Sequence, residues 1–175
     1  MITTERTKLR PLTCDDAENY AEMNADPLVR KHFPSVLTRE ISDKELDSII
    51  DHQSQHGFSF WAVEIEGELA GFCGFARTAD IMPFPQTVEI GWRLKSKYWR
   101  QGYTFEAATA CLQYGFETLN FPEVISYTAD PNIPSWSLME KLGMARGDNF
   151  AHPMLPENHP LARHRLYDLV KFRPL

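Results

Sequence analysis

The sequence predicts an α/β fold in which a mixed, mostly antiparallel sheet is flanked by helices. Two observations carry this prediction. Three consecutive segments alternate apolar and polar residues, which is typical of half-buried strands joined by hairpins. A helix-spaced apolar pattern lies between two later strand-like segments, so a strand–helix–strand crossover follows the hairpins. The predicted strands of this part of the chain are 61–65, 69–75, 88–94, 124–129 and 166–172.

The first sixty residues are expected to contribute one short strand, at 9–12, and three helices. A Thr and an Asp three residues apart at 13–16 form a capping box that starts the first helix. The Asp-Pro pair at 26–27 has the signature of a second helix start, and a Ser and a Glu at 42–45 repeat the capping box for a third. Gly57 is a natural stop for that third helix.

The second half of the chain predicts one long helix and one short helix. The long helix follows Gly102, and its apolar residues recur at three- and four-residue spacing on one face. The short helix, at 134–142, ends at Gly143. Between the hairpins, the loop 79–86 carries Met82 and Phe84, which we expect to be exposed and available for a homodimer contact.

Composition excludes several classes of protein. A chain of 175 residues, 43% of them hydrophobic, can form one core, so we expect a single domain spanning 1–175. No apolar run approaches the roughly 18 residues of a membrane span. The net charge of -6 and the lack of a basic run argue against a nucleic-acid partner. Three scattered cysteines and an N-terminus without a signal-like apolar block predict a cytoplasmic protein.

The most informative stretch is 88–106, VEIGWRLKSKYWRQGYTFE. A strand ends, a turn contains Arg100, Gln101 and Gly102, and a helix begins. Free N–H groups and the positive dipole end make a helix start a site for anions, and glycine lets the backbone approach a phosphate. Arg100 adds a positive charge. Taken alone, this turn fits an ordinary strand-to-helix connection equally well.

Two further pairs of residues lie near this turn in the predicted fold. Glu89 and Gly91 share one strand face, and a carboxylate beside a glycine suggests an opening where a ligand lies against bare backbone. Asn132 and Ser135 stand three residues apart, directly before a short helix. Ser135 also fits the role of a helix cap, and Asn132 that of a turn residue.

The runs VEIGWRL, YWRQGYTFEA and NIPSWSLMEKLGM resemble the GNAT acetyltransferase superfamily, and within it the RimJ/RimL-like branch. The resemblance spans roughly 9–144. It implies acetyl-CoA as co-substrate, an amine acceptor and no metal. It also implies that the strand at 91–94 pairs with pantetheine, that the turn at 100–104 binds the pyrophosphate, and that Asn132 and Ser135 reach the thiol end. The cofactor-binding residues implied in this way are Gly91, Trp92, Arg93, Leu94, Arg100, Gln101, Gly102, Tyr103, Thr104 and Asn132.

Three positions depart from the family pattern. The phosphate loop of the family begins with Gln or Arg and ends with Gly or Ala, whereas here Trp99 and Thr104 hold those positions. Many relatives carry a tyrosine that acts as general acid four residues before the glycine of the Leu-Gly-Phe motif. That position is Met139 here, so the acid is unassigned.

The catalytic hypothesis rests on Glu89 and Ser135. Glu89 would act as general base, through water, with a pKa raised toward neutrality by desolvation. Ser135 would hydrogen-bond the departing thiolate, and a backbone N–H at 90–92 would polarise the thioester carbonyl. The alternatives are that Glu89 is solvated or pairs with Arg93, and that Ser135 only caps a helix.

Several other functions stay open at this point. A non-catalytic CoA-binding or sensing domain would use the same turn, and an enzyme could transfer another acyl group or use an oxygen acceptor. A nucleotide-dependent phosphotransferase is disfavoured because the P-loop pattern is absent. The loop that contains His152, His159 and His164 is expected to line the acceptor site, with metal binding as the weaker interpretation.

Overall fold

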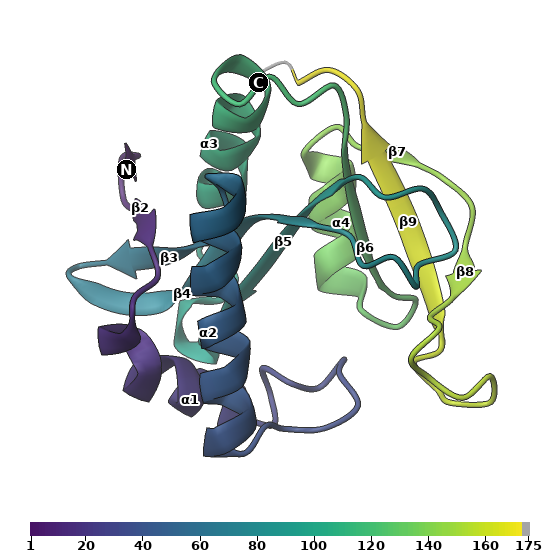
Figure 1. Cartoon of the computed structure of the whole chain (residues 1–175), viewed down its shortest axis with the longest axis horizontal. Helices are drawn as coiled ribbons and strands as arrows, with labels where there is room; N and C mark the ends of the chain where they lie inside the picture. The colour runs from purple at the N-terminus through teal and green to yellow at the C-terminus, as the bar shows by residue number, and fades with distance from the viewer. Residues whose placement is uncertain (173–175) are drawn as a thin grey trace. The chain divides into compact units, whose positions relative to one another are not determined.

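The computed structural model describes residues 1–172, which fall into two compact units (Figure 1). The first unit comprises Met1–Ala76 and Gly91–Cys111. The second comprises Arg77–Ile90 and the chain from Leu112 onward. Strand β5 (Val88–Leu94) contributes to both, because its first three residues belong to the second unit and the rest to the first.

The strands of the first unit follow the order β1-β2-β3-β4-β5. They are β1 (Ile2–Thr3), β2 (Lys8–Pro11), β3 (Phe60–Ile65), β4 (Glu68–Arg77) and the end of β5. Antiparallel pairing joins β1 to β2, β2 to β3 and β3 to β4. At Gly71, a side chain is excluded because an added Cβ would lie 2.1 Å from the carbonyl oxygen of Arg93. The β3–β4 hairpin expected from the alternating pattern is therefore confirmed, and β5 lies next to β4 in the sheet.

Two α-helices, not three, precede β3. The 3-10 turn at Cys14–Asp16 leads into α1 (Ala17–Ala25), and the Thr13 N–H donates to the Asp16 carboxylate at 2.9 Å, as the capping box predicts. The prediction of a helix after Asp26 is wrong. The Asp26 carboxylate and carbonyl accept the N–H groups of residues 28 and 30, which closes turns, and Pro34 prevents a helix from continuing.

Helix α2 (Arg39–His56) starts four residues earlier than predicted, because its cap is residue 38 and not residue 42. Its cap is Thr38, whose side chain accepts the Ile41 N–H, and Ser42 is buried within the helix, where it accepts a hydrogen bond from Asn24. Gly57 ends the helix with a φ of 77°. Helices α1 and α2 pack together in the first unit (Figure 1).

Another 3-10 turn, Ser96–Tyr98, connects β5 to α3 (Tyr103–Glu117), and this helix confirms the apolar pattern after Gly102. The core of the first unit is a cluster of buried apolar residues from α1, α2, β3, β4, the residue after β2 and the turn after α1. Its members are Leu12, Tyr20, Met23, Val29, Leu46, Ala62, Leu69 and Phe72.

In the second unit the strand order is β5-β6-β9-β7, with β8 paired to β9. These strands are β6 (Val124–Ala129), β7 (Ala145–Arg146), β8 (Phe150–Ala151) and β9 (Arg163–Leu169). The pairing of β5 with β6 is parallel, with Glu89 opposite Ile125, and the pairs of β9 with β6, β7 and β8 are antiparallel. The last strand lies three residues earlier than predicted. The mixed, mostly antiparallel sheet of the sequence prediction is confirmed.

Helix α4 (Ile133–Lys141) ends as expected at Gly143, with a φ of 82°, and the Met144 N–H donates to the Met139 carbonyl at 3.1 Å. The expectation that Met82 and Phe84 are exposed is wrong. Met82 is 7% exposed, and Phe84 is partly buried against aromatic neighbours of the same unit. A homodimer therefore has no support from these two side chains.

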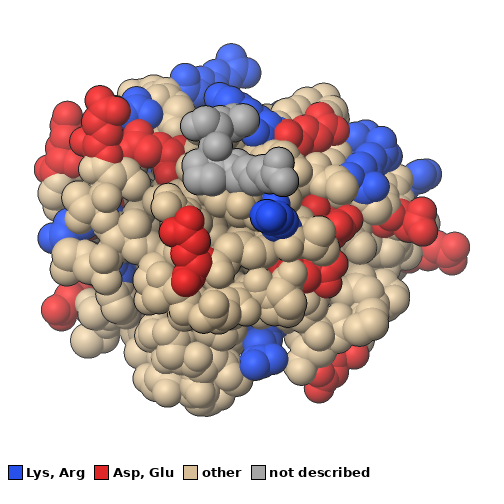
Figure 2. Space-filling model, turned by 90° about the horizontal axis from the view of Figure 1, so that it is seen from above, with Lys and Arg blue, Asp and Glu red and all other residues tan. Residues whose placement is uncertain are grey.

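Charged side chains of both signs are interspersed on the face shown in Figure 2. This agrees with a sequence that has 24 acidic and 18 basic residues and no run of one sign. The visible face therefore carries no continuous basic surface of the kind that binds nucleic acid.

Candidate functional site

The turn between β5 and α3 has the backbone geometry of an anion site. Arg100 and Gly102 both have positive φ, 60° and 85°. The Glu106 N–H donates to the Gly102 carbonyl at 3.0 Å, so the N–H groups of the three residues between them precede the first bond of the helix. The indole of Trp99 donates to the Leu94 carbonyl at 2.8 Å, which ties the start of the turn to the end of β5.

Arg6 holds this turn from the N-terminal segment, a contact that the sequence did not reveal. Its Nη1 donates to the Gln101 carbonyl at 2.9 Å, and its Nε donates to the Glu106 carboxylate at 2.7 Å. The guanidinium also lies 4.7 Å from the centre of the Tyr103 ring. An added Cβ at Gly102 would lie 3.2 Å from the Arg6 Nη2. The turn is thus fixed on one side by the Arg6–Glu106 ion pair.

The strand that leads to this turn does not have the opening at Gly91 that the sequence predicts. An added Cβ at Gly91 would lie 3.0 Å from the Phe60 ring, so this glycine makes room for an aromatic side chain rather than for a bare opening. Arg93 does not pair with Glu89. Its Nη1 donates to Asn24 at 2.7 Å and to Glu45 at 3.2 Å. The Arg93 side chain is therefore engaged within the first unit.

In the second unit, Glu89 receives a hydrogen bond from Tyr127. The register that places Glu89 opposite Ile125 explains this contact, because Tyr127 is two residues further along β6 and points to the same face as Ile125. Burial raises the pKa of Glu89 to about 7, and the Tyr127 hydrogen bond, which favours the carboxylate, lowers it by a smaller amount. Glu89 therefore has the pKa of a general base that works near neutral pH.

Tyr127 belongs to a cluster of partly buried rings. Its ring centroid lies 6.0 Å from that of Phe84, 5.7 Å from Phe150, 6.4 Å from His152 and 6.2 Å from His164. The sequence singled out the histidine loop but missed Tyr127, whose signal is only a tyrosine on the strand adjacent to Glu89. The cluster places the predicted acceptor loop beside the candidate base.

The two histidines of this cluster, 4.8 Å apart, are held in different tautomers. The Nδ1 of His152 accepts the Met154 N–H at 3.2 Å, so its ring proton is on Nε2. The Nδ1 of His164 faces the Ala162 carbonyl at 3.2 Å and must donate to it, which leaves Nε2 as an acceptor. Burial lowers the pKa of both rings, and at His164 the proximity of His152 lowers the pKa further. Both are therefore neutral at pH 7.

Asn132 and Ser135 lie at the start of α4. Asn132 is the N-cap residue, and its side-chain amide donates to the Thr128 hydroxyl at 2.9 Å. Ser135 is the third residue of the helix, and its N–H donates to the Asn132 carbonyl at 3.1 Å. The alternative role of Ser135 as the helix cap is therefore wrong, because Asn132 holds that position.

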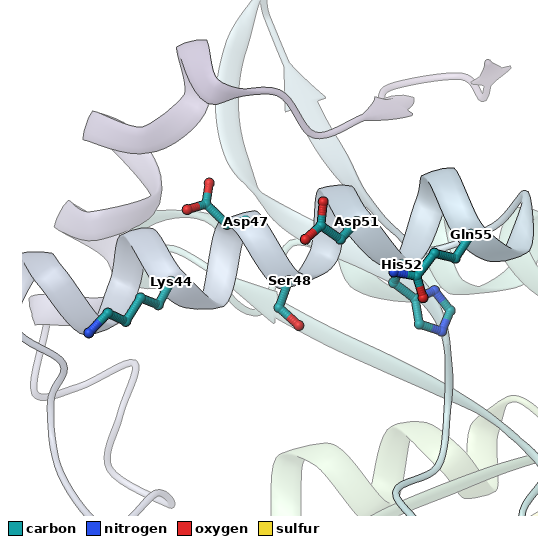
Figure 3. A pocket seen from close by; sticks show the side chains of 6 residues that line it. All are labelled: Lys44, Asp47, Ser48, Asp51, His52 and Gln55. Atoms are coloured by element: carbon teal, nitrogen blue, oxygen red, sulfur yellow. The ribbon is translucent and has the colours of Figure 1, made fainter.

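A hollow of about 400 Å³ lies on a different surface, along α2 (Figure 3). All its lining side chains leave this one helix and are polar or charged (Figure 3). They are Lys44, Asp47, Ser48, Asp51, His52 and Gln55. None of the predicted site residues lines this hollow, so it does not belong to the candidate site.

Residues 1–172 hold neither a cluster of metal ligands nor a membrane-spanning helix. No group of three or more His, Cys, Asp or Glu side chains in this part of the chain is arranged to hold a metal ion. No helix within the same residues is long and apolar enough to cross a membrane.

Comparisons with known proteins identify the family of this chain. The model of the acetyltransferase (GNAT) domain matches residues 6–145. YnaD, an uncharacterized N-acetyltransferase of Bacillus subtilis, is 28% identical over 90% of this chain and 89% of its own. A GNAT-family acetyltransferase from Bacillus anthracis, solved by crystallography, is 29% identical with a TM-score of 0.79 over 97% of both chains.

RimL, a ribosomal-protein acetyltransferase solved in complex with coenzyme A, has the same fold, with a TM-score of 0.76 over 95% of both chains. At 14% sequence identity this likeness concerns the fold alone. The matched segment contains the turn at 100–104, Glu89 and the N-cap of α4. The chain belongs to the GNAT acetyltransferase family, and its activity is acetyl transfer.

Proposed function

We propose that this protein transfers the acetyl group of acetyl-CoA directly to a primary amine, without a covalent acyl-enzyme. The observation that carries the proposal is Glu89, a desolvated carboxyl group whose pKa is raised to about 7 and whose position is held by Tyr127. A carboxylate of this kind accepts protons at the pH where amines must be deprotonated to react.

Acetyl-CoA would be bound by the turn and the strand before it. We assign the pyrophosphate to the backbone N–H groups of 100–104, with Arg100 as a further cation. The N–H groups at the start of α3 that precede the first bond of the helix support this assignment. The pantetheine arm would pair with the backbone of 91–94, and Asn132 would contact the cofactor near its thiol end.

The reaction consumes the ammonium form of the acceptor and releases CoA thiol. Glu89 takes one proton from the ammonium through water, the amine nitrogen attacks the thioester carbon, and a C–N bond replaces the C–S bond. The second amine proton leaves as the tetrahedral intermediate collapses, and the thiolate is protonated. A backbone N–H at 90–92 would stabilise the oxyanion, and the Ser135 hydroxyl would donate to the departing sulfur. The net products are the amide, CoA-SH and one proton.

The cofactor assignment is tested by titration calorimetry with acetyl-CoA, CoA and ATP in parallel. We expect micromolar binding of both CoA forms and no heat from ATP. Release of free thiol on addition of primary amines then tests the transfer itself. Binding of ATP with no binding of CoA would overturn the assignment, and tight CoA binding without thiol release for any amine would favour a sensing role.

The cytoplasmic location and the single domain stay predictions. The scattered cysteines support a cytoplasmic location. A single functional domain over 1–175 is supported by the family match, which covers segments of both compact units.

A further inference from the structure

Two arginines of the first unit lie against one aromatic ring. The guanidinium carbon of Arg30 is 4.2 Å from the centre of the Phe33 ring, and that of Arg93 is 4.6 Å from the same centre. Arg30 comes from the turns after α1, and Arg93 comes from β5. Both are buried, with 8% exposure for Arg30 and 9% for the Arg93 side chain. Two like charges thus lie against one aromatic ring with little exposure to solvent.

The negative charge around them does not balance this pair. Glu45 is the carboxylate that contacts Arg93, and it also accepts hydrogen bonds from Tyr20 and Asn24, each at 3.0 Å. Arg30 donates from Nε to the Ser35 carbonyl at 2.9 Å, and among residues 1–172 it has no carboxylate within ion-pair distance. Glu45 therefore pairs with Arg93, and Arg30 has no carboxylate partner among residues 1–172.

The donors of the two guanidinium groups are not all used. The Nε of Arg93 is buried and has no hydrogen-bond partner among the described residues. Desolvation, followed by the charge of Arg93, lowers the pKa of Arg30 to about 10. A buried cation without a counter-ion and a buried donor without an acceptor both cost free energy, and one bound anion would relieve both. Because the excess is one positive charge, a single carboxylate fits it better than a dianionic phosphate.

The position of Arg93 links this pair to the reaction. Arg93 is four residues after Glu89 on β5, and side chains four residues apart on a strand point to the same face. Arg93 therefore belongs to the same strand as the candidate base, Glu89. The acceptor is the reactant that must approach this base.

We propose that Arg30 and Arg93 bind a carboxylate of the acceptor, so that the substrates are amines that also carry a carboxylate, such as amino acids and their derivatives. This inference rests on the proposed acetyl transfer. The guanidinium fork matches a carboxylate through paired hydrogen bonds, and Phe33 holds the two forks in place by cation–π contact.

The test compares each amino acid with its own amide as acceptor, since the amide keeps the side chain and the amine but replaces the carboxylate with a neutral group. Because the amide also lowers the pKa of the amine, kcat/KM is calculated for the free-amine form of each acceptor. We expect kcat/KM to be at least tenfold higher for the acids. Arg30→Gln should remove this preference by raising KM for the acids, with kcat and the KM for acetyl-CoA little changed. Arg39→Gln is the matched control, because Arg39 is an exposed arginine of the same unit that pairs with Glu18 and Asp43. It should keep the preference.

A second measurement does not depend on turnover. The unfolding temperature is measured without CoA, in the presence of amino acids, amino-acid amides or sodium acetate. Amino acids and acetate, which carry a carboxylate, should raise the unfolding temperature of the wild type, and the amides should not. In Arg30→Gln none of these compounds should raise it. If no amine is acetylated but this pattern holds, the anion site stands and the proposed transfer fails.

Three results would overturn the carboxylate site. Equal kcat/KM for acids and amides in the wild type would do so, even where the variant does not fold. If Arg30→Gln lowers kcat/KM equally for the acids and for the amides, Arg30 has a structural role. A rise in the KM for acetyl-CoA alone would show that the pair binds a phosphate of the cofactor.

Discussion

The Tyr127 hydroxyl donates a hydrogen bond to the Glu89 carboxylate, and the parallel register of β5 and β6 places the two residues on one face of the sheet. The Tyr127 ring is in turn packed against Phe84, Phe150 and His152. A hydrogen bond from a ring that cannot move freely fixes the position of the carboxylate and moderates its pKa. The predictions about Glu89 follow from this relationship.

Tyr127→Phe should move the acid limb of the pH profile of kcat/KM upward by about one unit, because the hydrogen bond that favours the carboxylate is lost. In the wild type, activity should fall as the pH drops through about 7, since Glu89 must be ionised to accept a proton. The profile is measured with saturating acetyl-CoA over pH 5.5–9. An unchanged profile would mean that another group titrates.

Glu89→Gln should lower kcat by about 100-fold or more while leaving the Kd for acetyl-CoA unchanged, because the amide cannot take a proton. Turnover comes from thiol release and the Kd from calorimetry. The matched control is Glu123→Gln, which removes an acidic residue of the same unit that lies just before β6. Full activity in Glu89→Gln would remove this residue from the mechanism.

Glu89 should also make stability depend on pH. Its pKa is 4.5 in the unfolded chain and about 7 when folded, so between these values the folded state holds a proton that the unfolded state releases. The stability linked to this group is therefore present below pH 4.5 and is lost as the pH rises through 7. Relative to the wild type, Glu89→Gln should gain up to about 3 kcal/mol in free energy of unfolding between pH 4.5 and 8. Urea denaturation of both proteins at the two pH values measures this gain, and a constant difference would contradict the raised pKa.

Gly102→Ala should weaken acetyl-CoA binding by about tenfold, because the φ of 85° disfavours a side chain and the new Cβ would lie 3.2 Å from Arg6 at the proposed phosphate turn. Calorimetry gives the change in Kd. Gly57→Ala supplies the comparison, since Gly57 has a similar φ of 77° with no atom within 4 Å of an added Cβ. A similar loss of stability in both variants, with weaker binding only for Gly102→Ala, is the expected pattern.

Gly71→Ala should destabilise the protein by about 3 kcal/mol or more, or prevent folding, because the added Cβ would collide with backbone atoms of residues 93 and 94. Backbone of a neighbouring strand cannot give way as a flexible side chain can. Chemical denaturation measures the loss, with Gly67→Ala as the comparison, because space around Gly67 is open. A loss no larger than that of Gly67→Ala would show that the strands can separate at this point.

Local patterns were sufficient for most elements of this chain. The hairpins, the helix after Gly102 and the glycine stops at Gly57 and Gly143 follow from alternation, helical spacing and glycine conformation, which depend on neighbours within a few residues. The helix start at the turn 100–104 and the place of Glu89 on its strand also follow from local patterns, while their roles stay predictions. These features were predictable because their causes are local.

Contacts between distant segments decided the rest. Ser42 resembles a helix cap in sequence, but Asn24 binds it from another helix and Thr38 caps α2 instead. Arg6 reaches the turn from about a hundred residues away, and Tyr127 meets Glu89 only because their strands pair.

Arg93 stands within the motif that predicts a cofactor strand, yet its side chain is engaged by residues of α1 and α2, and it meets Arg30 at Phe33. No periodicity encodes such meetings, because they depend on strand register and on packing between elements. Local spacing thus determined the elements and pointed to Glu89 as the candidate base, whereas the tertiary structure decided the groups that surround it.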